Sequence, residues 1–243
     1  MASSPPPLEP LPADYGETRD ALHRLASYVL APARKAKTGR IGLRATPGGF
    51  GTPPFGDGEQ LRVEGASLVR RRGEGWEATG ITSLAAAAAF AGIALSEDPG
   101  IGHDAPPSGD TEAPLVVSAG ASAALGAWYG FSAMVLEELR TELINSGREC
   151  SEVQLWPEHF DLGCNVEGVN FGASPGDAYF AEPYVYVGPW NTEGLPDDGF
   201  WNAPFGAVLG YKDILAAEDQ PAAALAFLRR GADLALERAG GKP

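Results

Sequence analysis

Cysteine and histidine are scarce in this chain of 243 residues, which contains two cysteines and three histidines. Two cysteines cannot build a disulfide scaffold, and without a Cys-x-x-Cys pair they offer no zinc site of their own. Cys150 and Cys164 could come within reach of each other across a hairpin. No secretion signal is recognisable at the N-terminus, so we expect both thiols to stay reduced.

Motifs that mark common enzyme classes are also missing. There is no Gly-x-x-x-x-Gly-Lys loop and no Gly-x-Gly-x-x-Gly between a strand and a helix, the two patterns that hold nucleotide phosphates. Neither Gly-x-Ser-x-Gly nor His-Glu-x-x-His occurs, which leaves no nucleophile elbow and no zinc-protease helix. Nothing in the sequence identifies a cofactor or a metal, and nothing determines the oligomeric state.

Basic residues are outnumbered by acidic ones, 18 against 32, which gives a formal net charge of −14. Such a charge argues against a nucleic-acid partner and against binding to an anionic membrane. A hydrophobic content of 44% and a charged content of 21% are ordinary for a folded domain that can bury a core. Because no targeting segment is recognisable, these features predict a soluble cytoplasmic protein.

The chain is predicted to form one domain over residues 14–243. Residues 1–13 hold five prolines and no apolar run, so they are expected to form a disordered or extended tail. Residues 96–114 combine prolines, glycines and acidic residues with few apolar ones. This composition predicts a flexible connector within the domain.

Hydrophobic periodicity predicts three main helices. The first begins near Asp14, whose capping partner would be Glu17, and Pro32 is expected to kink or end it. The second covers residues 115–145. Its first 22 residues carry no charge and could span a bilayer, but their serines and glycines and the amphipathic continuation favour a buried helix. The third starts after Asp219, and alternating strands fill the intervals. The expected fold class is therefore α+β, with antiparallel sheets packed against three main helices.

Residues 152–168 are expected to form the hairpin around which a function is organised. Two short alternating runs flank Pro157-Glu158, and a turn there sets Leu155 opposite Phe160, with Leu162 on the same core face. Proline at the second turn position favours a type I turn with a local bulge. The opposite face is polar and aromatic and carries Gln154, Trp156, His159, Asp161 and Asn165.

Binding of a flat or sugar-like small molecule is one function that fits this face. Aromatic rings would hold the ligand, and His159 and Asp161 would orient it. The predicted ligand-binding residues are Trp156, Tyr184, Tyr186, Trp190 and Trp201. Covering of sheet edges would explain the same aromatic residues without any ligand.

A metal-dependent or general-base hydrolase is the alternative function. His159 would act beside Asp161, with His23 or Asp20 as a further partner. A carboxylate next to an imidazole orients the ring and raises its pKa, as a general base or metal ligand requires. Turn capping by His159 is the structural explanation of the same pattern. We favour the binding function over the catalytic one.

Three blocks of the sequence resemble an uncharacterised actinobacterial family, a domain of unknown function. The blocks are Glu17-Thr18-Arg19-Asp20-Ala21-Leu22-His23, Trp128–Leu143 continuing into Val153–Leu162 with Phe160-Asp161-Leu162, and Ala203–Leu228 ending in Ala222-Ala223-Ala224-Leu225-Ala226-Phe227-Leu228. They cover about half of the chain, in the family's order. The chain departs from the family by a shorter stretch over Gly80–Pro114 and by lacking a Trp and a Gln after His23. The resemblance implies a single soluble domain and transfers no activity.

Overall fold

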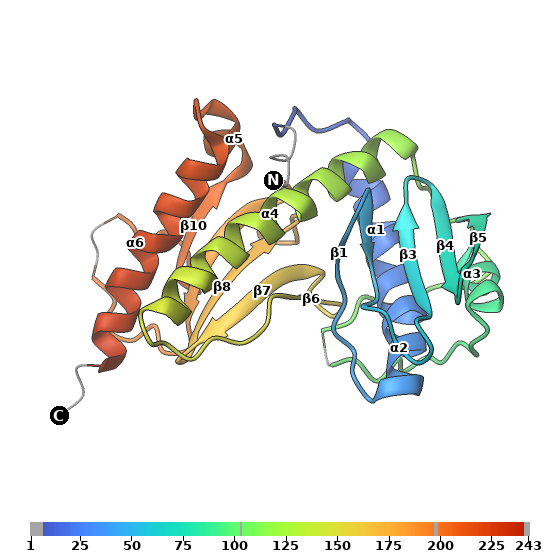
Figure 1. The fold of residues 1–243 in the computed structure, drawn as a ribbon. Helices are drawn as coiled ribbons and strands as arrows, with labels where there is room; N and C mark the ends of the chain where they lie inside the picture. The colour runs from blue at the N-terminus through green and yellow to red at the C-terminus, as the bar shows by residue number, and fades with distance from the viewer. Residues whose placement is uncertain (1–6, 103, 197–198, 241–243) are drawn as a thin grey trace. The chain divides into compact units, whose positions relative to one another are not determined.

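The computed structural model of the chain describes residues 7–102, 104–196 and 199–240. The chain divides into two compact units: unit 1 comprises Met1–Glu9, Phe131–Gln154 and Asp161–Pro243, and unit 2 comprises Pro10–Gly130 and Leu155–Phe160. Two antiparallel sheets combine with helices (Figure 1), so the predicted α+β class is confirmed. The single domain expected over residues 14–243 stays a prediction, and the two units are described one at a time.

The first helical stretch of unit 2 continues from Tyr15 to Thr38. It consists of α1 (Tyr15–Leu25), a π-helical turn η1 (Ala26–Leu30) and α2 (Ala31–Thr38). The predicted capping pair is wrong, because the side chain of Asp14 makes no cap hydrogen bond. Pro32 does not end the helix either. Proline has no backbone N–H, and its ring would clash with the carbonyl one turn earlier in an α-helix. The wider π turn directly before Pro32 accommodates it within the helical stretch.

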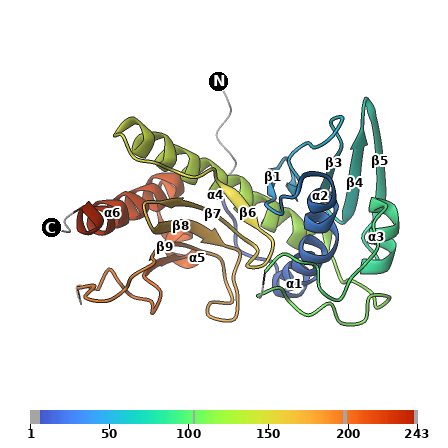
Figure 2. The same cartoon turned by 90° about the horizontal axis from the view of Figure 1, so that it is seen from below.

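The sheet of unit 2 has five antiparallel strands in the order β1-β2-β3-β4-β5. The strands are β1 (Arg44–Thr46), β2 (Gly49–Gly51), β3 (Gln60–Glu64), β4 (Ser67–Arg72) and β5 (Gly75–Gly80). Alternation along β3 and β4 buries Leu61, Val63 and Leu68. Helix α3 (Leu84–Ala91) follows and begins at Ser83, whose hydroxyl accepts the N–H of Ala86 at 3.1 Å. Figure 2 shows α1, α2 and α3 beside this sheet.

Residues 96–114, the expected flexible connector, form neither helix nor strand where the structure describes them, and residue 103 lies outside the described residues. They are bonded to the first helical stretch. The Tyr28 hydroxyl donates to the carbonyl of Pro106 at 2.8 Å, and the Arg24 guanidinium donates to the carbonyl of Ser108. The segment is thus irregular but attached to the helix, and its flexibility stays a prediction.

Helix α4 (Ala119–Asn145) contains the long uncharged run. Among the described helices it is the one long and apolar enough to cross a membrane, with a mean hydropathy of 1.2. Within the fold, 56% of that apolar window is buried. The bulky side chains of Trp128, Val135 and Leu139 belong to the core. This burial fits the helix of a soluble protein, as the sequence predicted.

The sheet of unit 1 has the order β10-β9-β8-β7, and the short strand β6 that ends this order is divided between the two units. Its elements are β6 (Gln154–Trp156), β7 (Asp161–Val166), β8 (Val169–Ser174), β9 (Tyr184–Pro189) and β10 (Ala207–Gly210), followed by α5 (Tyr211–Ala216) and α6 (Gln220–Gly240). Phe171, Val185 and Val187 are buried on the face that packs against α6. The opposite face of this sheet, which carries Tyr184 and Tyr186, is described below as the candidate site.

The expected N-terminal tail falls partly outside the described residues, since the description begins at residue 7. Leu8 is buried, and its backbone N–H donates to Oε1 of Gln220 at 2.7 Å. The side chain of Gln220 also donates to the carbonyl of Leu8 at 3.2 Å. At this point residue 8 is attached to the first turn of α6.

The turn between β6 and β7 is wider than predicted. All of residues 157–160 lie in the turn, and the N–H of Phe160 donates to the carbonyl of Trp156 at 2.7 Å. Phe160 therefore does not lie opposite Leu155 in a strand. Pro157 is the reason, because it cannot adopt the positive φ that a tight two-residue turn requires. Phe160 and Leu162 are both buried, as predicted.

Phe160 closes this turn in a left-handed backbone conformation, with φ at 59°. Such a conformation costs a residue with a side chain about 1–2 kcal/mol. Its ring packs edge-on against Phe50 and Tyr129, with centroid distances of 5.0 and 5.5 Å. The Tyr129 hydroxyl donates to the Phe160 carbonyl at 2.7 Å. The packing of unit 2 thus holds the conformation that the turn needs.

Two helical glycines give a test of the packing between α6 and β9. A Cβ on Gly231 of α6 would lie 2.4 Å from Cγ2 of Val187, whereas one on Gly130 of α4 would meet nothing within 4 Å. We expect Gly231→Ala to lower the free energy of unfolding by about 1–3 kcal/mol through overpacking. Gly130→Ala should raise it by about 0.5–1 kcal/mol because alanine restricts the unfolded chain. Urea denaturation measures both, and equal effects would contradict the close approach.

Candidate functional site

Tyr186 of β9 lies across two glycines of the neighbouring strands. Gly163, Gly172 and Tyr186 are paired side by side across β7, β8 and β9. A Cβ on Gly172 would lie 2.3 Å from Cζ of Tyr186, and one on Gly163 would lie 3.6 Å from its hydroxyl oxygen. The missing side chain of Gly172 leaves a gap that the phenol ring fills, and the hydroxyl lies at ordinary contact distance over Gly163. The Tyr186 hydroxyl thereby reaches the carboxylate of Asp161 and donates to it.

Tyr184 makes a second contact of the same kind on this face. Its hydroxyl donates to Oδ2 of Asp177 at 2.5 Å, and Oδ1 of Asp177 accepts the backbone N–H groups of Tyr179 and Phe180 at 2.8 and 2.9 Å. Asp177 thus fixes both the phenol and the loop before β9. Ring contacts with centroids 4.6–6.4 Å apart join an aromatic cluster of Tyr179, Phe180, Tyr184, Tyr186 and Phe205.

Both phenols stay protonated at neutral pH. Burial raises the pKa of Tyr186 well above its usual range, and the neighbouring Asp161 raises it further. Burial likewise raises the pKa of Tyr184, with an additional contribution from its hydrogen bond to Asp177. The two residues are therefore hydrogen-bond donors and not general bases.

A pocket of about 660 Å³ opens beside Tyr184. Its lining includes three aromatic residues, Phe180, Tyr184 and Tyr211, and three charged residues, Glu182, Lys212 and Asp213. Lys212 Nζ lies 3.3 Å from Oε1 of Glu182. The Tyr211 hydroxyl donates to the carbonyl of Glu9 at 2.7 Å, and burial raises the pKa of Tyr211 to about 12.

The edge of the sheet next to this pocket is closed by a side chain. Val208 of the edge strand β10 donates its N–H to Oδ1 of Asn202 at 2.8 Å and accepts from Nδ2 of Asn202 at 3.0 Å. The amide of Asn202 therefore replaces the backbone of a further strand at this position. Such a cap discourages pairing with another chain, and Asn202 and Val208 both line the pocket.

The structure brings together two of the five predicted ligand-binding residues. The rings of Tyr184 and Tyr186 lie 6.1 Å apart. Trp190 is 74% exposed and donates from Nε1 to Asn170 at 3.3 Å. Trp201 packs edge-on against Phe200 at 5.0 Å, and Trp156 lies in unit 2. Of the five, Tyr184 lines the pocket.

The predicted catalytic residues have separate partners. Asp161 lies in unit 1 and accepts from Tyr186, whereas His159 and His23 lie in unit 2. The carboxylate beside His159 is that of Asp104, with Nε2 and Oδ2 3.9 Å apart and both side chains largely exposed. The structure thus shows His159 and Asp161 with different polar partners, although only one residue separates them in sequence.

His23 is held as a structural donor. Its Nε2 lies 3.0 Å from the carbonyl oxygen of Pro157 and 3.2 Å from that of Glu158, so the proton sits on Nε2. The ring of Phe160 is stacked on it at 4.9 Å. Burial lowers the pKa of His23 to about 4, although the two carbonyl groups favour the charged form. The imidazole is therefore neutral at pH 7.

Metal ligands and thiols add no further group to this site. Within the described residues, no three His, Cys, Asp or Glu side chains are arranged to hold a metal ion. Cys150 and Cys164 are both free. Burial raises the pKa of Cys164 to about 12, so this thiol stays protonated.

Sequence reasoning missed Asp177, Phe180 and Tyr211, which shape the pocket. Asp177 stands two residues before an aromatic pair, and an aspartate in that position typically accepts backbone N–H groups of a turn. Gly163 and Gly172 were a second signal, since glycines inside strands often mark a close approach of another group. Neither signal indicates which aromatic ring fills the gap.

Comparison of the chain with protein-family models, with curated proteins and with solved structures gives no match. A functional assignment therefore rests on the geometry described above.

Substitutions in the glycine gap test the placement of Tyr186. Gly172→Ala should lower the free energy of unfolding by about 1–3 kcal/mol because the methyl group displaces the phenol. Gly188→Ala is the control, since a Cβ there has its nearest neighbour at an ordinary 3.5 Å. Tyr186→Phe should cost about 1.5–3 kcal/mol because the buried Asp161 loses a donor. Urea denaturation measures these changes. An equal loss of unfolding free energy in Gly172→Ala and Gly188→Ala would contradict the close approach of Tyr186 to Gly172.

The pH dependence of stability tests the state of His23. Its pKa is about 4 in the folded chain against 6.5 for the ordinary side chain, so the unfolded chain takes up the proton first. The contribution of His23 is therefore complete above about pH 6.5 and is lost as the pH falls to about 4, by roughly 3 kcal/mol.

Variants separate this effect from the titration of carboxylates. His23→Gln retains an N–H donor and cannot titrate. Urea denaturation at a pH above this range and at a pH below it gives the loss of stability on acidification. This loss should be smaller for His23→Gln than for the wild type. His159→Gln changes an exposed histidine and is the comparison variant. A His23→Gln variant that loses as much stability on acidification as the wild type would refute the assignment.

Proposed function

We propose that unit 1 binds a flat or sugar-like small molecule in the pocket beside Tyr184. The supporting observation is the pocket itself, which has a volume of about 660 Å³ and includes three aromatic side chains in its lining. Apolar and aromatic walls with a few polar groups are the usual construction of small-molecule sites, and this volume lies in their range. The ring of Tyr184 is held in place by Asp177, so the wall is formed before a ligand arrives.

Charges at the pocket favour a ligand with hydrogen-bond donors or a positive charge. Lys212 is offset by Glu182, and Asp213 makes no ion pair within the described part of the chain. The faces of the aromatic rings are also regions of negative potential, which attract cations and polarised C–H groups. A carboxylate ligand would meet this excess of negative charge.

The charge of the chain bears on its partners. A net charge of −14 would repel nucleic acids and anionic lipids, so we propose a binding or accessory protein without such partners. We propose a soluble, cytoplasmic setting for it. The hydrolase built on His159 and Asp161 stays an untested hypothesis, because no contact between the two supports it.

A titration followed by ¹H–¹⁵N NMR tests the binding function. The probes are tryptamine, adenosine and methyl β-glucoside, with indole-3-acetate as the anionic counterpart of tryptamine. At least one of the first three should shift the amide signals of residues 180–184 and 208–213, and indole-3-acetate should bind at least about tenfold more weakly than tryptamine.

Two aromatic variants provide the control. Phe180→Ala removes part of the pocket lining and should weaken binding at least about tenfold, equivalent to about 1.4 kcal/mol. Trp190→Ala removes an exposed ring that does not line the pocket and should leave binding unchanged. Equal losses in the two variants, or shifts confined to other residues, would count against the pocket.

A further inference from the structure

A second pocket lies within unit 2, between α2, the last turn of α3 and the strands β3 and β4. Its volume is about 460 Å³. Much of its lining is apolar and includes Pro32, Ala33, Phe55, Leu61 and Ile93. This lining suits the hydrocarbon part of a small molecule.

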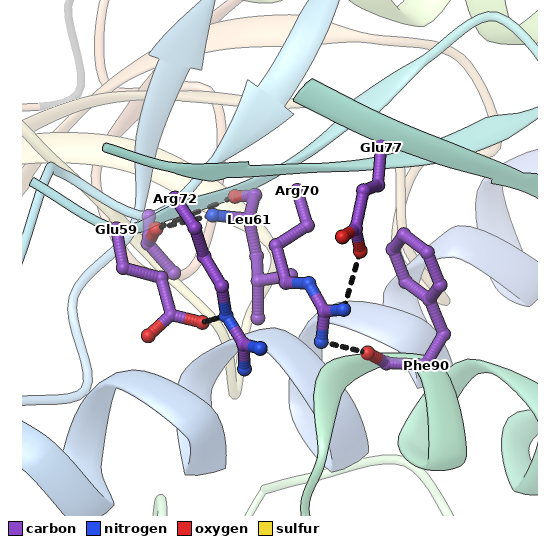
Figure 3. Close-up of polar contacts among 7 residues, drawn as sticks. Glu59, Leu61, Arg70, Arg72, Glu77 and Phe90 are labelled. Atoms are coloured by element: carbon purple, nitrogen blue, oxygen red, sulfur yellow. Dashed lines mark hydrogen bonds and ion pairs between the residues drawn. The ribbon is translucent and has the colours of Figure 1, made fainter. Parts of the chain in front are cut away.

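Two cationic side chains, Lys37 and Arg72, also line this pocket. Nε of Arg72 lies 3.2 Å from Oε1 of Glu59 (Figure 3), which uses one of the guanidinium donors. Within the residues that the structure describes, the Nη groups of Arg72 and the ammonium of Lys37 have no hydrogen-bond or ion-pair partner. The lining thus contains two cationic side chains and one carboxylate, that of Glu59. The pocket therefore has an excess of positive charge although the chain as a whole is acidic.

Arg70 adds a third cation to this region. It precedes Arg72 by two residues, and Figure 3 shows both side chains pointing the same way from the strand. Arg70 donates to the carbonyl of Phe90 near the end of α3 and to the carboxylate of Glu77. The C-terminal end of α3 carries the negative end of the helix dipole, which would repel an anion. The positive charge of Arg70 at the Phe90 carbonyl offsets this negative potential.

We propose that this pocket binds an amphipathic anion, a small molecule with a short apolar body and a carboxylate head group. The body covers the apolar lining, and the carboxylate lies between Lys37 and Arg72. A guanidinium offers parallel N–H donors that match the two oxygens of a carboxylate, and a lysine adds a point charge. The pocket beside Tyr184 has the opposite balance of charge, so the two sites are distinguished by the sign of the ligand.

Isothermal titration calorimetry with octanoate, below its micelle concentration, tests the proposal. 1-Octanol has the body without the charge, acetate has the head group without the body, and octylamine reverses the charge. Octanoate should bind at least tenfold more tightly than any of the three. An equal or higher affinity for 1-octanol or octylamine overturns the proposal, as does an equal affinity for acetate.

Neighbouring arginines supply a matched pair of variants. Arg72→Gln and Lys37→Gln should each weaken octanoate binding at least fivefold. Arg71→Gln should not, because Arg71 projects from the other side of β4 and its guanidinium carbon lies 5.6 Å from the ring centre of Trp76. An equal loss in Arg71→Gln and Arg72→Gln overturns the proposal.

A variant that fills the pocket covers the case in which a charge substitution disturbs folding. Ala36 is an exposed residue of α2 in the lining, so Ala36→Phe can fill the space without disturbing the core. It should abolish octanoate binding while the circular dichroism spectrum stays unchanged. Retained affinity in a folded Ala36→Phe protein overturns the proposal. None of these residues lies in the pocket beside Tyr184, so a failure here is separate from a failure of the proposed function.

Discussion

The contact between Tyr186 and Asp161 depends on the absence of a side chain at Gly172. A methyl group at Gly172 would occupy the space of the phenol ring, and without that space the hydroxyl could not reach the buried carboxylate. The opposite face of β9 is constrained as well, because Gly231 lets α6 approach Val187 closely. The strand is therefore fixed from both sides. Tyr184 lies two residues from Tyr186 on the same face of β9, so its position is fixed as well. Of these two tyrosines, Tyr184 lines the pocket.

The two pockets differ in the sign of their charge, and the two units differ in the amount of negative charge that they carry. Unit 2 contains eleven of the 18 basic residues of the chain and 14 of its 32 acidic residues, so most of the negative charge belongs to unit 1. The basic residues of unit 2 are also placed on particular faces. Arg70 and Arg72 share one side of β4, and Arg71 lies on the other against Trp76. Alternation along one strand thus separates the cations that reach the pocket from the one that covers an exposed indole.

Patterns local in sequence were enough to predict the fold class, the three main helices, the burial of Phe160 and Leu162, and the common face of Tyr184 and Tyr186. Long-range pairing was not predictable in this way. Asp161 meets Tyr186 because β8 lies between β7 and β9 in the sheet, and the sequence order of the strands does not show which carboxylate faces which phenol. The passage of a helix through Pro32 was missed for a different reason, since a π turn carries no recognised sequence signature.

The histidine pattern that resembled a catalytic site is explained in part by the shape of a turn. Pro157 requires a wide turn, and a wide turn directs backbone carbonyls inward, where each needs a donor. The carbonyl of Pro157 accepts from Nε2 of His23 at 3.0 Å and from the hydroxyl of Ser27 at 2.9 Å. These contacts satisfy buried backbone groups and hold a neutral imidazole whose Nε2–H acts as a structural donor. The recognition that we propose for unit 1 therefore uses the sheet face, where Tyr184 is fixed by Asp177 and lines the pocket.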